Sequence, residues 1–262
     1  MIHLSFYDLL IAAALIALLA TLSWHYRLGL TGQLIVASLR TLVQLLLVGL
    51  ILKVLFETPN IWLLTLIACV MLAAASREVL ARQKYPFKGW WGYGLSSGSM
   101  FISSFTVTLL ALTVIIENQP WYSPQYAIPL LGMLLGNTMT GIALSLDRLS
   151  SDAYRQKNII EQRLMLGQNS QTAIHHIKSD SLRAGLMPTI NAMATAGLVS
   201  LPGMMTGQIL AGSPPVEAVK YQILILFLIT AGTGFGTLCA VSIASRHLFD
   251  ERHRLRLDKL RR

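Results

Sequence analysis

The chain has 262 residues, of which 54% are hydrophobic and only 13% are charged. A soluble domain usually carries about 25% charged residues and does not need repeated uncharged stretches of about 20 residues, so this composition excludes an ordinary water-soluble domain. The formal net charge of +9 does not indicate a nucleic-acid partner, because Lys and Arg fall between the apolar runs and at the C-terminus.

The apolar runs predict an all-α integral membrane protein with about seven transmembrane helices, because a helix satisfies all its backbone groups internally in lipid. The first run is expected to stay as a membrane helix, since residues 1–8 contain no Lys or Arg and no signal-type cleavage site follows. In chain order the expected spans are Leu4–Ser23, Leu39–Phe56, Ile61–Ala75, Leu95–Ile116, Ala127–Leu146, Ala184–Ala211 and Tyr221–Ser245.

The distribution of basic residues predicts the orientation of these spans. Of the 21 Lys and Arg residues, 19 fall in or beside alternate loops or after the last span, and only Lys53 and Lys220 fall in or beside the opposite loops. Basic loops stay in the cytoplasm. We therefore expect the N-terminus outside, the C-terminus inside, and a basic cytoplasmic tail over residues 246–262, most simply an interfacial helix on anionic lipid.

The sixth run, Ala184–Ala211, is too long for a simple crossing and contains Pro188, Pro202 and several glycines. Proline removes a helix hydrogen bond and kinks the chain, and broken membrane helices occur where they line a cavity or pack on protein. This run predicts either a moving, pathway-lining element or a static kink at a helix interface.

Glycine pairs spaced four residues apart predict places where helices approach closely. Such pairs are common in helical membrane proteins, so they indicate packing and not a particular function. Three pairs occur: Gly132/Gly136, Gly203/Gly207 and Gly232/Gly236.

The longest polar segment, residues 147–183, lies between the fifth and sixth expected spans. Two short helices fit it, Asp152–Leu166 and Ser170–Asp180, with Gly167 suited to a helix C-terminus and Ser170 to an N-cap. The apolar residues of these helices offer a surface that packs on the membrane domain or docks a partner. They are Ile159, Ile160, Leu164, Leu166, Ala173, Ile174 and Ile177.

The sequence has no G-x-x-x-x-G-K-[ST] loop and no H-E-x-x-H motif, and the only Asp or Glu inside an expected span is Asp8, near the start of the first. It therefore predicts no ATP site of its own, and it disfavours proton-coupled carriers and intramembrane proteases. Polar residues within the spans are candidates for lining a pathway, although Arg can snorkel to the interface and Asn often joins helices. These candidates are Arg40, Gln44, Asn137 and Asn191.

Seven methionines lie in or near spans four to six. Thioethers bind soft metals, but methionine is also an adaptable packing residue, so metal ligands stay unassigned. The seven are Met100, Met133, Met139, Met187, Met193, Met204 and Met205.

The polar segment resembles the E-A-A-x-x-x-G-x9-I-x-L-P loop of ABC transporter permeases through Glu161, Gly167 and Ile177. In those permeases a short helix seats in a cleft of the ATP-binding subunit. The sequence departs from the pattern at Gln162 and Arg163, which replace the two alanines, and at its end, where Ser-Asp replaces Leu-Pro.

Other stretches resemble the FetB family of ABC transporter permeases over about residues 35–240. The longest is S-L-P-G-M-M-T-G at residues 200–207, followed by Ala211-Gly212 and by K-Y-Q at residues 220–222. The remaining matches are P-L-L-G-M at residues 129–133 with Gly136-Asn137, Arg183-Ala184 with Pro188-Thr189, and Arg40 with Gln44 and Gly49.

The resemblance implies a single transmembrane permease domain over residues 1–262 in the bacterial cytoplasmic (inner) membrane, exporting iron or another metal-related solute. It implies a separate ABC ATP-binding subunit that holds ATP and Mg, a second permease copy in a homodimer, and membrane lipid as partners. The chain itself would bind no cofactor and would not be an enzyme.

The same resemblance assigns two groups of site residues. The residues expected at the ATPase contact are Glu161, Arg163, Gly167 and Ile177. The residues expected at a pathway or gate are Arg40, Gln44, Asn137, Asn191, Pro202, Gly203, Met204, Met205 and Gly207. The residues alone leave two other classes open: a secondary metal or solute carrier, and a non-transport membrane scaffold.

Overall fold

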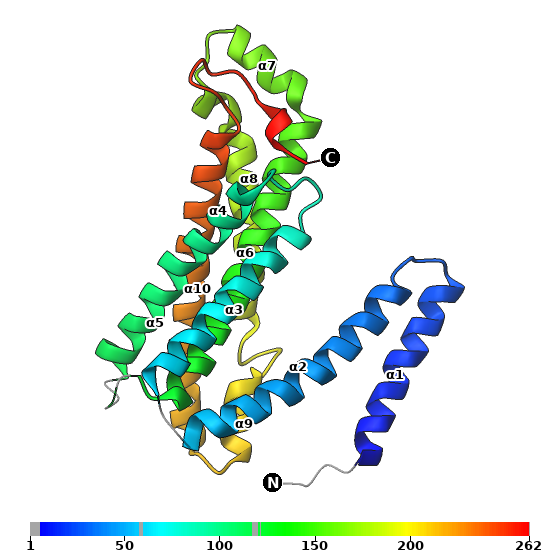
Figure 1. Cartoon of the computed structure of the whole chain (residues 1–262), viewed down its shortest axis with the longest axis vertical. Helices are drawn as coiled ribbons and strands as arrows, with labels where there is room; N and C mark the ends of the chain where they lie inside the picture. Colours follow the sequence, from blue (N-terminus) through cyan, green and yellow to red (C-terminus); the bar gives the residue numbers. More distant parts are fainter. Residues whose placement is uncertain (1–5, 58–59, 117–119, 121, 262) are drawn as a thin grey trace. The chain divides into compact units, whose positions relative to one another are not determined.

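The computed structural model describes residues 6–57, 60–116, 120 and 122–261, and secondary structure there is helical apart from isolated bridges (Figure 1). Contacts between residues divide the chain into two compact units, Met1–Asn60 and Ile61–Arg262. We call these unit 1 and unit 2. The expectation of one permease domain over the whole chain stays a prediction.

Unit 1 is a pair of helices, α1 (Phe6–His25) and α2 (Thr31–Glu57), joined by a tight turn. The backbone N–H of Leu28 donates to the Ser23 carbonyl at 3.0 Å, and Gly29 adopts a left-handed conformation with φ of 71°. Both helices are long and apolar enough to span a membrane. The second helix begins at Thr31, well before the expected start of its span at Leu39.

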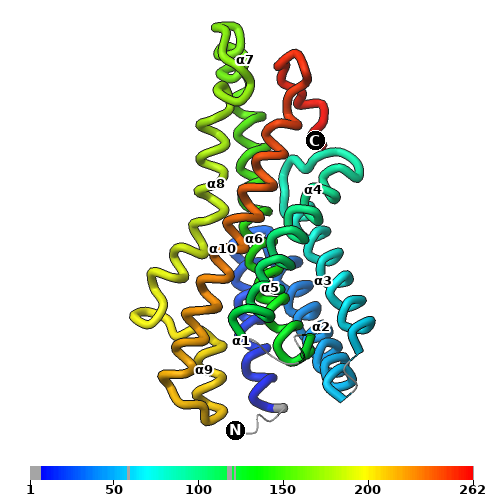
Figure 2. Tube along the Cα trace, turned by 90° about the vertical axis from the view of Figure 1, so that its left-hand side faces the viewer, coloured from blue at the N-terminus to red at the C-terminus, as the bar shows by residue number. Residues whose placement is uncertain are grey.

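Unit 2 is a bundle in which α6, α8 and α10 pack side by side, and α3 packs on α6 and α4 (Figures 1 and 2). The fourth expected span of the chain lies in this unit and is one helical rod, in which two wider π-type turns, η1 and η2, alternate with α segments. The elements are α3 (Ile61–Ala81), α4 (Trp90–Met100), η1 (Phe101–Phe105), α5 (Thr106–Leu110), η2 (Ala111–Ile115), α6 (Pro124–Arg155), α7 (Lys157–Met165), α8 (Ser170–Thr195), α9 (Gly203–Leu210), α10 (Pro215–His247) and η3 (Leu257–Lys259).

The described residues contain six helices long and apolar enough to cross a membrane, which confirms an all-helical, multi-pass architecture. The expected sixth span, Ala184–Ala211, is not among them. It is divided between the second half of α8, a turn at residues 196–202, and α9. Pro188 lies inside α8 and does not end it; the helix ends before Gly197, whose φ is 83°.

Three helices of unit 2 are longer than a bilayer requires. With 32, 26 and 33 residues, α6, α8 and α10 measure about 48, 39 and 50 Å, against a hydrocarbon core of about 30 Å. The expected short helix Ser170–Asp180 is wrong as a separate element, because it forms the first part of α8. The expected helix Asp152–Leu166 is divided, since α6 continues to Arg155 and α7 covers only residues 157–165.

The extended ends of these helices meet the loop at residues 82–89 and the C-terminal segment, residues 248–261. The Lys84 backbone N–H donates to the Asp147 carboxylate at 2.7 Å, and Tyr85 stacks on Tyr154 with ring centroids 4.9 Å apart. The basic segments of unit 2 that follow α3, α6 and α10 therefore share one end of the bundle, which we call the charged end.

The expected interfacial helix in the tail is wrong. Apart from the single turn η3, the C-terminal segment is a chain of turns and bridges that pairs with the 82–89 loop. The Lys88 N–H donates to the Lys259 carbonyl and the Arg261 N–H to the Pro86 carbonyl, both at 2.8 Å. Leu248 and Leu260 are buried in the core, so this segment is fastened down by apolar packing as well as by hydrogen bonds.

Candidate functional site

The charged end of unit 2 ends in a helical hairpin formed by α7, a short turn and the start of α8, which we call the tip (Figure 1). Gly167 adopts a φ of 86°, and its N–H donates to the Leu164 carbonyl at 3.0 Å, while the Gln168 N–H donates to the Arg163 carbonyl at 3.1 Å. This pair of bonds is a Schellman motif, which ends a helix at a left-handed residue and favours glycine there. The predicted role of Gly167 as a helix terminator is confirmed.

The cap of α8 lies one residue earlier than expected. The Asn169 side-chain oxygen accepts from the Thr172 N–H at 2.8 Å, so Asn169 and not Ser170 is the N-cap. The Ser170 hydroxyl instead lies 2.9 Å from His253 Nδ1. This contact ties the start of α8 to the C-terminal segment and holds the base of the tip.

The residues expected at an ATPase contact are in the tip but have different surroundings. Glu161 is partly exposed and lies 3.6 Å from the Lys157 ammonium, one turn earlier on α7. Arg163 donates to the Ala173 carbonyl at 3.2 Å and so joins α7 to α8. Ile177 is 3% exposed and packs in the core of unit 2. Glu161 is therefore accessible to a partner, whereas Ile177 is not.

The tip also exposes apolar residues that the motif does not contain. Met165 and Leu166 are 85% and 82% exposed, whereas Ile160 and Ile174 are buried against the bundle. Sequence reasoning included Leu166 but missed Met165. Its position directly before a helix-ending turn was the available signal, because such a residue lies at the apex of a hairpin.

Below the charged end, α6, α8 and α10 approach closely along a seam of small residues. A Cβ atom added to Gly185 would lie 2.4 Å from the Gly141 carbonyl oxygen, and one added to Gly236 would lie 2.6 Å from the Thr138 methyl. The close approach predicted for Gly232 and Gly236 is confirmed. The closest crossing, between Gly141 and Gly185, was missed because it joins single glycines on different helices.

Buried hydroxyl groups lie on α4, η1, α6 and α10 of the same bundle. Five of them have no hydrogen-bond partner within the part of the chain that the structure describes: Ser99, Ser104, Thr138, Ser145 and Thr233. A buried hydroxyl without a partner costs free energy, on the order of 1–3 kcal/mol. These unpartnered hydroxyls are polar groups inside an otherwise apolar bundle and are candidates for contact with a polar solute.

At the end of the bundle opposite the tip, α9 and the starts of α6 and α10 enclose a cavity of about 200 Å³. The cavity wall is largely aliphatic, with six side chains that carry sulfur, amide or phenol groups. These are Gln125, Tyr126, Met133, Met204, Gln208 and Tyr221. The Gln208 side-chain oxygen is buried and has no hydrogen-bond partner among the described residues, so the cavity holds an acceptor available to a ligand.

The turn at residues 196–202 and α9 contain the predicted gate residues. Pro202 caps α9 and Gly203 is its first residue. Met204 lines the cavity, whereas Met205 is buried and its N–H donates to the Gln222 side-chain oxygen at 3.3 Å. Gly207 is exposed, with open space where a Cβ would lie.

Gln208 is the cavity residue that sequence reasoning missed. It follows Met204 by four residues on a helix, which places both side chains on one face, and that spacing was the available signal.

The other predicted pathway residues lie on exposed helix faces. Asn137 lies on an exposed face of α6, where its amide donates to the Met133 carbonyl at 2.8 Å. Asn191 is exposed on α8. Arg40 and Gln44 lie in unit 1, on exposed positions of α2.

The described residues contain no group of three or more His, Cys, Asp or Glu side chains placed to hold a metal ion. The donors that the cavity offers are two thioethers, two amides and two phenols. Thioethers favour soft cations, and amide oxygens accept from cations and from hydrogen-bond donors alike.

Comparison with known proteins adds family evidence to this geometry. The chain is similar to a UPF0014 membrane protein of Synechocystis sp., with 40% identity over 243 residues that cover 91% of each chain. It is similar to the Probable iron export permease protein FetB of Escherichia coli, with 31% identity over 264 residues covering 97% of this chain and 96% of that one. It is also similar to Protein ALUMINUM SENSITIVE 3 of Arabidopsis thaliana, with 29% identity over 245 residues covering 93% and 88%.

No solved structure matches the chain. The profile of the Uncharacterised protein family (UPF0014) matches residues 6–249, which is nearly the whole sequence. This match and the near full-length likeness to FetB confirm the resemblance seen in the sequence motifs. The chain therefore belongs to the UPF0014 family of membrane proteins, together with its FetB-like permeases.

Proposed function

We propose that this protein is the membrane-spanning permease subunit of an ABC transporter that exports iron or another metal-related solute. The observation that carries the proposal is the likeness, over nearly the whole of both chains, to a protein named as a probable iron export permease. ATP and Mg would be held by a separate subunit, since this sequence has no P-loop motif.

The tip supports a contact with that subunit. It protrudes beyond the length that a bilayer covers, it carries Glu161 at the motif position, and it exposes Met165 and Leu166 at its apex. A short helix with an exposed apolar apex is suited to a cleft on a soluble partner. Arg163 and Gly167 fix the shape of the tip, and Ile177 anchors its base in the core.

The cavity supports a role for the opposite end in handling the solute. The cavity lies beside α9. In this proposal α8, the turn at residues 196–202 and α9 form a broken sixth crossing, and the turn and α9 are the part of it that moves during transport. In this proposal the chain crosses the bacterial inner membrane seven times, with the N-terminus outside and the charged end in the cytoplasm. Two copies of the chain pair to complete the transporter.

Purification of the tagged chain from native membranes tests the proposal. We expect a P-loop subunit to co-purify in equal amount, the complex to hydrolyse ATP, and vesicles containing it to export iron. Glu161→Lys should lose the P-loop subunit and at least about tenfold of the transport rate, because a reversed charge at a docking contact costs more than 1.4 kcal/mol.

Lys157→Gln is the matched control, because it breaks the ion pair within α7 but leaves Glu161 available to a partner. If Lys157→Gln reproduced the Glu161→Lys defect, the ion pair and not the docking contact would explain it. A chain that purifies alone, or one whose transport survives ATP depletion, would refute the proposed ABC partnership.

A further inference from the structure

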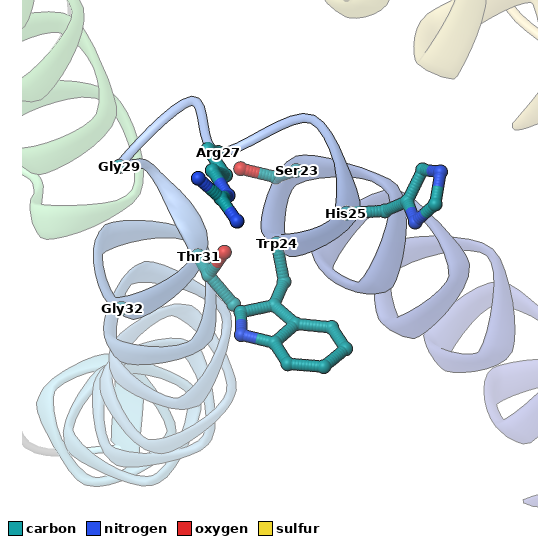
Figure 3. Close-up of a pocket in the computed structure, with 7 residues that line it drawn as sticks. All are labelled: Ser23, Trp24, His25, Arg27, Gly29, Thr31 and Gly32. Atoms are coloured by element: carbon teal, nitrogen blue, oxygen red, sulfur yellow. The ribbon is translucent and has the colours of Figure 1, made fainter.

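The turn between α1 and α2 surrounds a concavity of about 710 Å³ that the transport proposal does not use. Its seven lining residues all lie between positions 23 and 32, so the site is complete within unit 1 (Figure 3). Ser23, Trp24 and Arg27 supply its hydroxyl, its indole and its guanidinium. Because the whole wall comes from one short stretch of chain, each lining side chain can be tested by its own single substitution.

The concavity is electropositive. Arg27 lies at its centre, the His25 ring points away from it, and residues 23–32 contain no acidic side chain (Figure 3). The wall also includes the first turn of α2, a helix of 27 residues. The first backbone N–H groups of a helix have no intrahelical acceptor, and the helix dipole adds partial positive charge at this end. Both features favour an oxyanion.

A buried hydroxyl at the same place indicates a ligand independently of the helix end. Ser23 is 2% exposed, and its hydroxyl has no hydrogen-bond partner among the described residues. A buried donor left without a partner costs free energy, so native sites commonly supply one. Figure 3 shows the Ser23 hydroxyl and the Arg27 guanidinium directed to the same space. The Thr31 hydroxyl donates instead to the Ala20 carbonyl at 3.4 Å.

The surroundings of the concavity are those of a membrane interface. It lies where two helices apolar enough to span a bilayer turn back, and Trp24 on its rim is 75% exposed. Tryptophan concentrates at the level of lipid head groups, and basic residues there attract anionic lipid. A phosphate ester held in a membrane therefore fits both the charge of the site and its position better than a soluble anion does.

We propose that the α1–α2 turn binds the phosphate group of an anionic phospholipid. Arg27 pairs with two phosphate oxygens, the Ser23 hydroxyl donates to the phosphate, and the α2 N-terminus faces it. Trp24 packs on the glycerol and acyl region. A zwitterionic lipid is disfavoured, because its ammonium group would lie close to the Arg27 charge.

Native mass spectrometry of the purified full chain tests this site, with phosphatidylglycerol as the probe. Arg27→Asn is the informative variant, because Arg27 has a φ of 52° and asparagine tolerates that left-handed conformation, so the charge is removed without backbone strain. We expect the affinity for phosphatidylglycerol to fall about tenfold in Arg27→Asn and several-fold in Ser23→Ala. Arg27→Lys should retain part of the affinity, since it keeps the charge and loses bidentate geometry.

Lys53→Gln is the matched control, because it removes one positive charge at the other end of α2 and should leave the affinity unchanged. Thermal unfolding of each variant separates lost binding from lost fold, and phosphatidylcholine should bind wild type and Arg27→Asn equally weakly. Equal phosphatidylglycerol affinity in Arg27→Asn and Lys53→Gln would overturn the proposal. So would displacement of the lipid by millimolar inorganic phosphate, which would identify free phosphate as the ligand.

Discussion

The two ends of unit 2 are built differently. At the charged end, the 82–89 loop, α6, the start of α8 and the C-terminal segment are joined by hydrogen bonds such as Lys84 to Asp147 and Ser170 to His253. At the opposite end, α9 is a short helix between two turns, and it borders a cavity. The first end is held by many polar ties, whereas the second retains room to rearrange.

The bundle is therefore held rigidly at the charged end and is freer to rearrange near α9. The seam of Gly141 and Gly185 lies between the two ends and leaves no space between α6 and α8. A movement of α8 at one end therefore has to be accommodated by sliding along the seam or by rearrangement near α9, since a close-packed interface cannot compress. Three substitutions or treatments test this view.

The largest effect is expected in the seam. An added Cβ at Gly185 would lie 1.9 Å from the Ser145 hydroxyl and 2.4 Å from the Gly141 carbonyl, and a backbone atom cannot move aside. Gly185→Ala should therefore lower the free energy of unfolding by about 2–3 kcal/mol, measured by denaturant or thermal unfolding in detergent. Gly207→Ala is the control, because nothing lies within 4 Å of an added Cβ there, and it should be neutral or slightly stabilising. Equal destabilisation by both variants would contradict the contrast between the seam and α9.

A smaller effect is expected at the cavity. Met204 lines it and Met205 does not, so Met204→Leu should reduce iron export several-fold while Met205→Leu stays near the wild-type rate. The two changes conserve volume and should each cost less than about 1.5 kcal/mol of stability, so flux in vesicles reports the thioether directly. Wild-type export in Met204→Leu would show that the thioether is not needed.

The smallest effect is expected at the charged end on acidification. Two hydrogen bonds of 2.9 Å from Arg256 lower the pKa of Asp258 from 3.8 to about 2, and the Arg254 backbone N–H lowers the pKa of Asp250. Because both values are depressed in the folded state, the carboxylates stabilise the C-terminal segment above pH 4 and lose that effect as the pH falls toward 2. Hydrogen exchange of residues 248–261 should accelerate over that interval, while that of the seam stays constant. Asp258→Asn should remove part of the dependence.

Long apolar runs were sufficient to predict an all-helical membrane protein, and six of the seven expected spans lie on helices of suitable length. The end of α7 at Gly167 was predictable because a left-handed terminator favours glycine. The sequence could not place the junction of α8 with the tip, because Asp180 and Arg183 on a continuous helix look like a loop when only polarity is read. Nor could it reveal that the tail folds back, since Leu248 and Leu260 pack against residues distant in the sequence.

The site was predictable only where one element carries it. Met204 and Gln208 follow from helical spacing on α9, but their neighbour Met133 comes from α6 and needs the tertiary structure. The crossing of Gly141 with Gly185 likewise depends on two helices whose relative register no local pattern determines.

The uninterrupted course of α8 has a mechanical consequence. This helix begins in the tip and ends at Thr195, next to the turn that leads into α9, so one rod of about 39 Å joins the two ends of the bundle. A rotation of about 5° about its first residues would displace its far end by roughly 3 Å, which is about the diameter of a water molecule. A lever of this length would convert a small tilt imposed at the tip into a displacement of ionic dimensions at the turn of residues 196–202, which leads into α9 and the cavity.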